Sequence, residues 1–129
     1  MTDQLTPIGP VLVELPPVSA MSRVARLTAT GVASMAGFTI DEIDDINVIV
    51  SEVMVALVEH GAHSSITVTF DVTGGYFTVR GATELSDFDL EHPDLALCRT
   101  VLAAVSTNHG IERDGTRAEI WATLQQTQA

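Results

Sequence analysis

The apolar residues of this chain recur with two periods, one typical of helices and one typical of strands. Between residues 39 and 61 they return every three or four positions, and Thr39 with Glu42 matches the capping box of a helix N-terminus. Apolar and polar residues alternate over 66–71, and two glycines separate this run from a second one at 76–79. The pattern predicts a long helix followed by a β-hairpin.

The same reasoning places the remaining elements. A strand over 11–15 ends at a pair of prolines, a helix starts near Ser19, and another helix runs from Pro93 to about residue 108. A final hairpin pairs 111–112 with 118–124. The order β-α-α-β-β-α-β-β predicts an α+β fold, a two-layer sandwich with a mostly antiparallel sheet and three helices on one face.

The first two helices differ in how their faces are divided. One face of the first helix is expected to be ordinary core; its residues are Met21, Val24, Ala25, Thr28, Val32 and Met35. The second helix is apolar around most of its circumference and carries three acids seven residues apart, Asp45, Glu52 and Glu59. It is therefore expected to be the central helix.

Length and composition fit one folded domain. The chain has 129 residues, of which 46% are hydrophobic, and we expect a leader over 1–10, a single domain over 11–124 and a polar tail over 125–129. No apolar run approaches the roughly 20 residues of a membrane span, and the first residues lack a signal-peptide pattern. We expect a cytoplasmic protein. Cys98, the only cysteine, is expected to be a small buried residue.

The charge is strongly acidic. Seventeen acidic residues and six basic ones give a formal net charge of −11, which would repel nucleic acid and anionic membranes. All six basic residues are arginines. Without lysine, the chain cannot use a Walker-type phosphate lysine or a Schiff base.

The second helix carries a recognisable motif. Ser51, Glu52, Glu59 and His60 match S-E-x-x-x-N-A-x-E-H-A, a pattern of the GHKL (Bergerat-fold) ATPase superfamily, and Ala56 stands at its asparagine. The chain resembles the anti-sigma-factor serine kinases of this superfamily over about residues 11–124. The resemblance implies that Glu52 is the general base and that position 56 normally holds magnesium. Gly115 and Thr116 are similar to the Gly-Thr pair near the end of the family's domain.

Other motifs of the family are missing. Its Asp-x-Gly-x-Gly falls on 79–83, where Gly81 is the one remnant, and its phosphate-binding Gly-x-Gly-Leu falls on 94–97 without either glycine. A Cβ at such positions keeps the backbone away from phosphate. The loop that would form the nucleotide lid carries five acids, Glu84, Asp87, Asp89, Glu91 and Asp94, which would repel a triphosphate.

These observations favour a binding protein over an enzyme. We expect an anti-sigma-factor-like regulator with a degenerate nucleotide site, no cofactor, and a sigma factor or an anti-sigma antagonist as its protein partner. The alternative is an active ATP-dependent serine/threonine kinase that uses Glu52, ATP and magnesium. A third reading is a dimerisation module, in which the chain forms a homodimer.

Simpler explanations exist for each site residue. Glu52 can belong to a solvated acidic stripe, and His60 can interact with the helix dipole. Glu59, His60 and His63 offer too few ligands for us to expect a metal, and the acids at 87–91 lack the glycine and glutamate of a calcium loop. The apolar lid residues either anchor the loop or form a protein interface; they are Leu85, Phe88 and Leu90.

Overall fold

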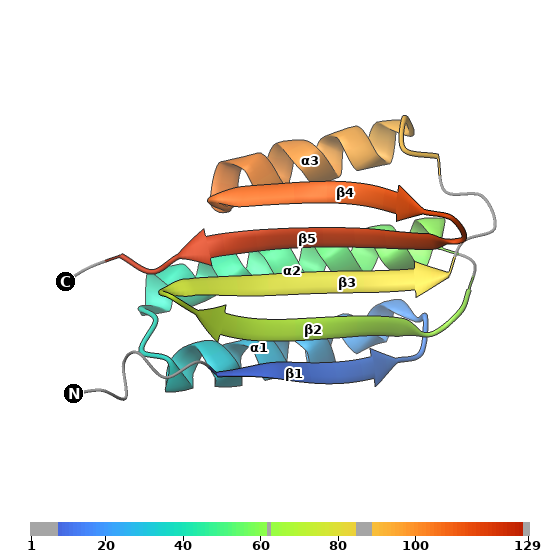
Figure 1. Ribbon diagram of the computed structural model, residues 1–129. Helices are drawn as coiled ribbons and strands as arrows, with labels where there is room; N and C mark the ends of the chain where they lie inside the picture. Colours follow the sequence, from blue (N-terminus) through green and yellow to red (C-terminus); the bar gives the residue numbers. More distant parts are fainter. Residues whose placement is uncertain (1–7, 62, 85–88, 128–129) are drawn as a thin grey trace.

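One antiparallel sheet of five strands forms the first layer of the protein (Figure 1). The computed structural model describes residues 8–61, 63–84 and 89–127. The order across the sheet is β1-β2-β3-β5-β4, and every neighbouring pair is antiparallel. The strands are β1 (Ile8–Leu15), β2 (Ile66–Thr73), β3 (Tyr76–Glu84), β4 (Asn108–Asp114) and β5 (Arg117–Gln125).

Three helices form the second layer. They are α1 (Ser22–Met35), preceded by a 3-10 turn η2 (Ser19–Met21), α2 (Ile40–His60) and α3 (Pro93–Val105). Contacts place α1 against β2, α2 against β3 and β5, and α3 against β4. The predicted α+β sandwich with its helices on one face is confirmed. No described helix combines the length and apolarity that a membrane crossing needs.

The central position of α2 follows from its sequence. Its apolar stripe lies between the sheet and both neighbouring helices, and four of its side chains have no exposed surface: Ile46, Val50, Val53 and Met54. Facing them from the sheet are Phe70, Val79 and Ile120, each at most 1% exposed. Burial of each such side chain contributes about 1.5–3 kcal/mol relative to exposure. The core is therefore centred under α2.

Both predicted hairpins are present. Gly74 and Gly75 have φ of 62° and 81°, as a two-residue turn with two left-handed positions requires. Gly115, with φ of 61°, occupies the second turn beside Thr116. The family-like Gly-Thr pair is thus the turn between β4 and β5.

The buried face of α1 differs from the predicted one. Val24 is 40% exposed and Met35 is 77% exposed, while Ala29 and Ala33 have no exposed surface. The helix packs through small residues because it lies close to α2, and larger side chains at the flanks of this stripe remain outside. The sequence analysis placed Val24 and Met35 in the core, and it was wrong at these two positions.

The N-terminus of α2 forms the predicted capping box. Glu42 N donates to Thr39 Oγ1 at 3.1 Å, and Thr39 N donates to Glu42 Oε1 at 2.7 Å. The other carboxylate oxygen of Glu42 accepts from N and Oγ1 of Thr127, at 2.6 and 2.8 Å. Within the segment predicted as a tail, Thr127 therefore fastens the chain after β5 to the start of α2.

Candidate functional site

A cleft of about 260 Å³ lies between α2 and α3. This volume is just below the range of about 300–1,000 Å³ common for ligand sites. Residues from both helices line it: Glu52, Val55, Ala56, Glu59, His60, Asp94, Leu97 and Cys98. The cleft thus includes four of the residues that the family resemblance singled out, namely Glu52, Ala56, Glu59 and His60.

Helix periodicity brings the α2 side of the cleft together. Glu52, Ala56 and Glu59 follow one another at spacings of four and three, which places them on one face. Burial raises the pKa of Glu52, so its carboxylate holds its proton more tightly than a free one. Ala56 is 4% exposed and carries no oxygen or nitrogen on its side chain. The position corresponding to the family's magnesium ligand therefore has no ligand atom.

Cys98 closes the cleft from α3. Its side chain is buried, and its Sγ donates a weak hydrogen bond to the backbone oxygen of Glu52 at 3.9 Å. Burial, together with the charge of Glu52, raises the pKa of the thiol to about 11, although Arg99 opposes the shift. The thiol therefore stays protonated at neutral pH and acts as a packing group, as predicted for Cys98.

Two histidines and an aspartate meet at one end of the cleft. His60 Nε2 lies 3.4 Å from Asp94 Oδ2, and His92 Nδ1 lies 3.8 Å from the same oxygen. The two rings have centroids 4.6 Å apart. His92 also caps α3, because its Nδ1 accepts from Asp94 N at 3.1 Å. His60 Nε2 is buried and makes no hydrogen bond, since its approach to Asp94 is not aligned for one.

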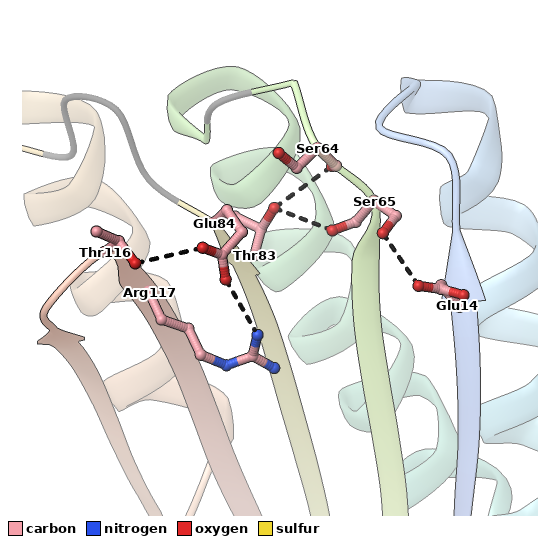
Figure 2. Close-up of polar contacts among 7 residues, drawn as sticks. All are labelled: Glu14, Ser64, Ser65, Thr83, Glu84, Thr116 and Arg117. Carbon is pink, nitrogen blue, oxygen red and sulfur yellow. Dashed lines mark hydrogen bonds and ion pairs between the residues drawn. The ribbon is translucent and has the colours of Figure 1, made fainter.

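A polar network fixes the ends of the strands at the same end of the molecule (Figures 1 and 2). Thr83 Oγ1 donates to the backbone oxygens of Ser64 and Ser65, at 3.4 and 3.1 Å. Glu84 accepts from Thr116 Oγ1 at 3.3 Å and lies 3.6 Å from an Arg117 nitrogen (Figure 2). The contacts of Thr83 hold the segment that follows His60 against β3.

Two glycines near the cleft have steric explanations. A Cβ at Gly61 would lie 2.5 Å from the Leu57 backbone oxygen, and one at Gly81 would lie 2.5 Å from Val53 Cγ1. Gly61 has φ of −80°, so close approach and not left-handed backbone selects glycine there. Gly81, which the family resemblance aligned with Asp-x-Gly-x-Gly, allows α2 to sit directly on β3.

The described lid acids make different contacts. Glu84 is engaged by Thr116 and Arg117, and Asp89 Oδ1 accepts from Glu91 N at 2.9 Å. Of the described lid acids, Asp94 alone lines the cleft. Leu90 packs against the core, in line with an anchoring role. Leu85, Asp87 and Phe88 lie outside the described residues.

The cleft is acidic on both walls. It has three carboxylates, those of Glu52, Glu59 and Asp94, and no arginine among its described lining residues. Two arginines on the helices are used elsewhere: Arg26 donates to Ser51 Oγ at 3.3 Å, and Arg99 donates to Leu90 O at 3.1 Å. Such a cleft suits cationic or apolar groups better than a polyphosphate.

Sequence reasoning missed part of the site. Cys98 was expected only as a small buried residue and Leu97 only as the last position of the degenerate motif at 94–97. His92, which lies beside the cleft, belonged to no motif. Leu97 is 64% exposed at the mouth of the cleft. The available signal was local: His92 precedes Pro93 at the position of an N-cap, which places its ring at the start of α3.

Comparison with known structures identifies proteins that share the fold of this chain. The chain aligns with a Mycobacterium tuberculosis protein containing RsbU and RsbW domains, with a TM-score of 0.77 and 17% identity over 95% of this chain. It spans 34% of that protein's length. No protein-family model matches the sequence, and no curated protein matches it.

Two further structures share the fold. A chain of the SiaB–SiaC complex from Pseudomonas aeruginosa aligns with a TM-score of 0.57 and 12% identity, covering 88% of each chain. The Acinetobacter baumannii histidine kinase AdeS aligns with a TM-score of 0.55 and 7% identity, over 94% of this chain and 70% of the other. The protein has the histidine-kinase-like ATPase fold, which confirms the predicted GHKL resemblance at the level of fold.

Proposed function

We propose that the protein is an anti-sigma-factor-like regulator that acts by binding another protein through the cleft between α2 and α3. The observation that carries this proposal is the composition of the cleft. Its walls offer three carboxylates, two exposed apolar side chains, Val55 and Leu97, and a buried alanine in place of the magnesium ligand. A partner surface with basic and apolar side chains complements these groups.

The same composition disfavours nucleotide. A triphosphate brings about four negative charges next to three carboxylates, and each like-charge pair about 4 Å apart costs on the order of 1–4 kcal/mol without a metal between them. The described lining has no arginine to offset this cost. No nucleotide or magnesium is therefore required by the proposed mode of action.

Two fold neighbours support a protein partner. One is an RsbW-containing protein and the other comes from a complex of two proteins, SiaB and SiaC. Sigma factors and anti-sigma antagonists are accordingly the classes of partner that we infer for this chain.

A second candidate function is serine/threonine kinase activity. One observation favours it: Glu52 lies in the cleft, and burial raises its pKa, as suits a general base. A kinase would transfer phosphate from ATP to a hydroxyl of the partner, and Glu52→Gln would abolish this transfer without abolishing binding.

The binding proposal is tested with purified sigma factors and anti-sigma antagonists from the source organism. Leu97→Ser should weaken the interaction at least about tenfold, since an apolar anchor at an interface contributes more than 1 kcal/mol. Leu12→Ser is the matched control, because Leu12 is 63% exposed but lies on β1, away from the cleft. No binding by any partner, or equal losses in both variants, would contradict the proposal.

A further inference from the structure

His60, His92 and Asp94 form a cluster that neither the family resemblance nor the sequence predicted. One ligand atom from each residue can be chosen so that all three lie within 4.8 Å of one another. His60 ends α2, whereas His92 and Asp94 begin α3. The cluster therefore connects the two helices that form the walls of the cleft.

We propose that this cluster is a binding site for a divalent transition-metal ion such as Zn²⁺. Two imidazoles and a single carboxylate suit Zn²⁺ better than Mg²⁺ or Ca²⁺, which prefer sets of oxygen ligands. The site is distinct from the magnesium position of the family, which falls on Ala56.

The distances fit a tetrahedral ion. Metal–ligand bonds of about 2.0–2.1 Å give an edge of about 3.3–3.4 Å between two ligands of a tetrahedron. The distance from His60 Nε2 to Asp94 Oδ2 is 3.4 Å, and that from His92 Nδ1 to the same oxygen is 3.8 Å. The first pair already has the spacing of two ligands. Binding of the ion by His92 Nδ1 would replace the hydrogen bond that this atom accepts from Asp94 N, because its single lone pair serves one partner at a time.

The state of His60 is a second, independent observation. Its Nε2 is buried without a hydrogen-bond partner, and leaving such an atom unsatisfied costs about 1–3 kcal/mol. A metal ion on this atom would remove that cost. The side chains of His92 and Asp94 are 42% and 60% exposed, so an ion can enter from solvent and keep water as its fourth ligand.

Calorimetric titration of Zn²⁺ into the full chain tests the proposal, with Co²⁺ and its visible absorption as a second probe of coordination geometry. We expect one ion per chain and, in His92→Ser or His60→Gln, a loss of affinity of at least about tenfold. Serine at position 92 retains an N-cap acceptor, so α3 should stay folded. Circular dichroism of each variant checks this.

His63→Ser is the matched control. His63 is exposed and lies near His60 in sequence, but it is not part of the cluster. This variant should bind Zn²⁺ with the affinity of the wild-type chain. Absence of saturable binding at about 1 mM Zn²⁺, or equal affinity in wild type and His92→Ser, would overturn the proposal. Either result is independent of partner binding.

Discussion

Gly81 on β3 lies so close to Val53 on α2 that a Cβ at Gly81 would be 2.5 Å from Val53 Cγ1. The same Cβ would lie 2.8 Å from Leu57 Cδ1. Glycine at this position thus determines how closely α2 sits on the sheet. The position of the cleft depends on this packing, because Glu52 and Ala56 flank Val53 and Leu57 along the same helix.

Gly81→Ala should destabilise the protein by about 1–3 kcal/mol, because overpacking of a filled core forces side chains or backbone to move. Urea unfolding measures the change. Gly31→Ala is the control, since Gly31 lies in α1 and a Cβ added there would meet no atom within 4 Å. Alanine at this position should stabilise the helix by about 0.5–1 kcal/mol. Stabilisation by both substitutions would show that α2 is not seated on β3 in this way.

Glu42→Gln should destabilise the protein near neutral pH by about 1–3 kcal/mol, because hydrogen bonds to a charged acceptor are lost. Burial raises the pKa of Glu42, but hydrogen bonds from Thr127 and Thr39 lower it by more, so that the net pKa is below its ordinary value. The stabilisation is therefore present above the unfolded-state pKa of about 4.3 and is lost as pH falls through the lower folded-state pKa. Unfolding of both proteins between about pH 3 and 7 checks this.

Thr127→Val separates the contribution of the chain after β5. It removes the hydroxyl donor to Glu42 Oε2 but keeps the backbone donor, so the loss should be about 1 kcal/mol. A loss as large as that of Glu42→Gln would mean that the capping box itself contributes little.

Glu52→Gln should change stability with the opposite dependence on pH. Burial raises the pKa of Glu52, so its ionised form is disfavoured in the folded state. The variant should gain stability relative to wild type as pH rises from about 4.3 through the raised folded-state pKa, by less than about 1 kcal/mol because solvent screens the side chain. A difference that stays constant across this range would show that the carboxylate is not desolvated.

Partner association should slow as salt rises, because screening over roughly 8 Å at physiological ionic strength weakens attraction to the acidic cleft. Glu59→Gln should lower the association rate and its dependence on salt, as stopped-flow or surface binding kinetics can measure. A rate that is independent of salt in both proteins would place the recognition surface elsewhere.

Much of the fold could be predicted from the sequence because its signals are local. The Thr39–Glu42 capping box, the glycine pair at 74–75 and the strand alternation each depend on a few neighbouring residues. The error at Val24 and Met35 has a different origin. Which side of α1 is buried depends on how the helix is rotated against α2 and the sheet, and this rotation is a property of the packed structure.

The candidate site could be predicted only in part. Glu52, Ala56, Glu59 and His60 were found through one helical motif, and the structure places all four in the cleft. Leu97 and Cys98 come from α3, which is separated from α2 in sequence by two strands of the sheet. The contacts of the lid acids could not be read from spacing, because hydrogen bonds such as that from Thr116 to Glu84 join different strands.

Titration of Mg-ATP into the wild-type chain tests most directly whether the protein acts without nucleotide. We predict no saturable heat and a shift in melting temperature of less than about one degree at millimolar Mg-ATP, since a ligand far below its dissociation constant contributes almost no stabilisation. Saturable binding well below millimolar concentration, together with phosphate transfer to a partner hydroxyl that Glu52→Gln abolishes, would contradict the account and establish the kinase instead.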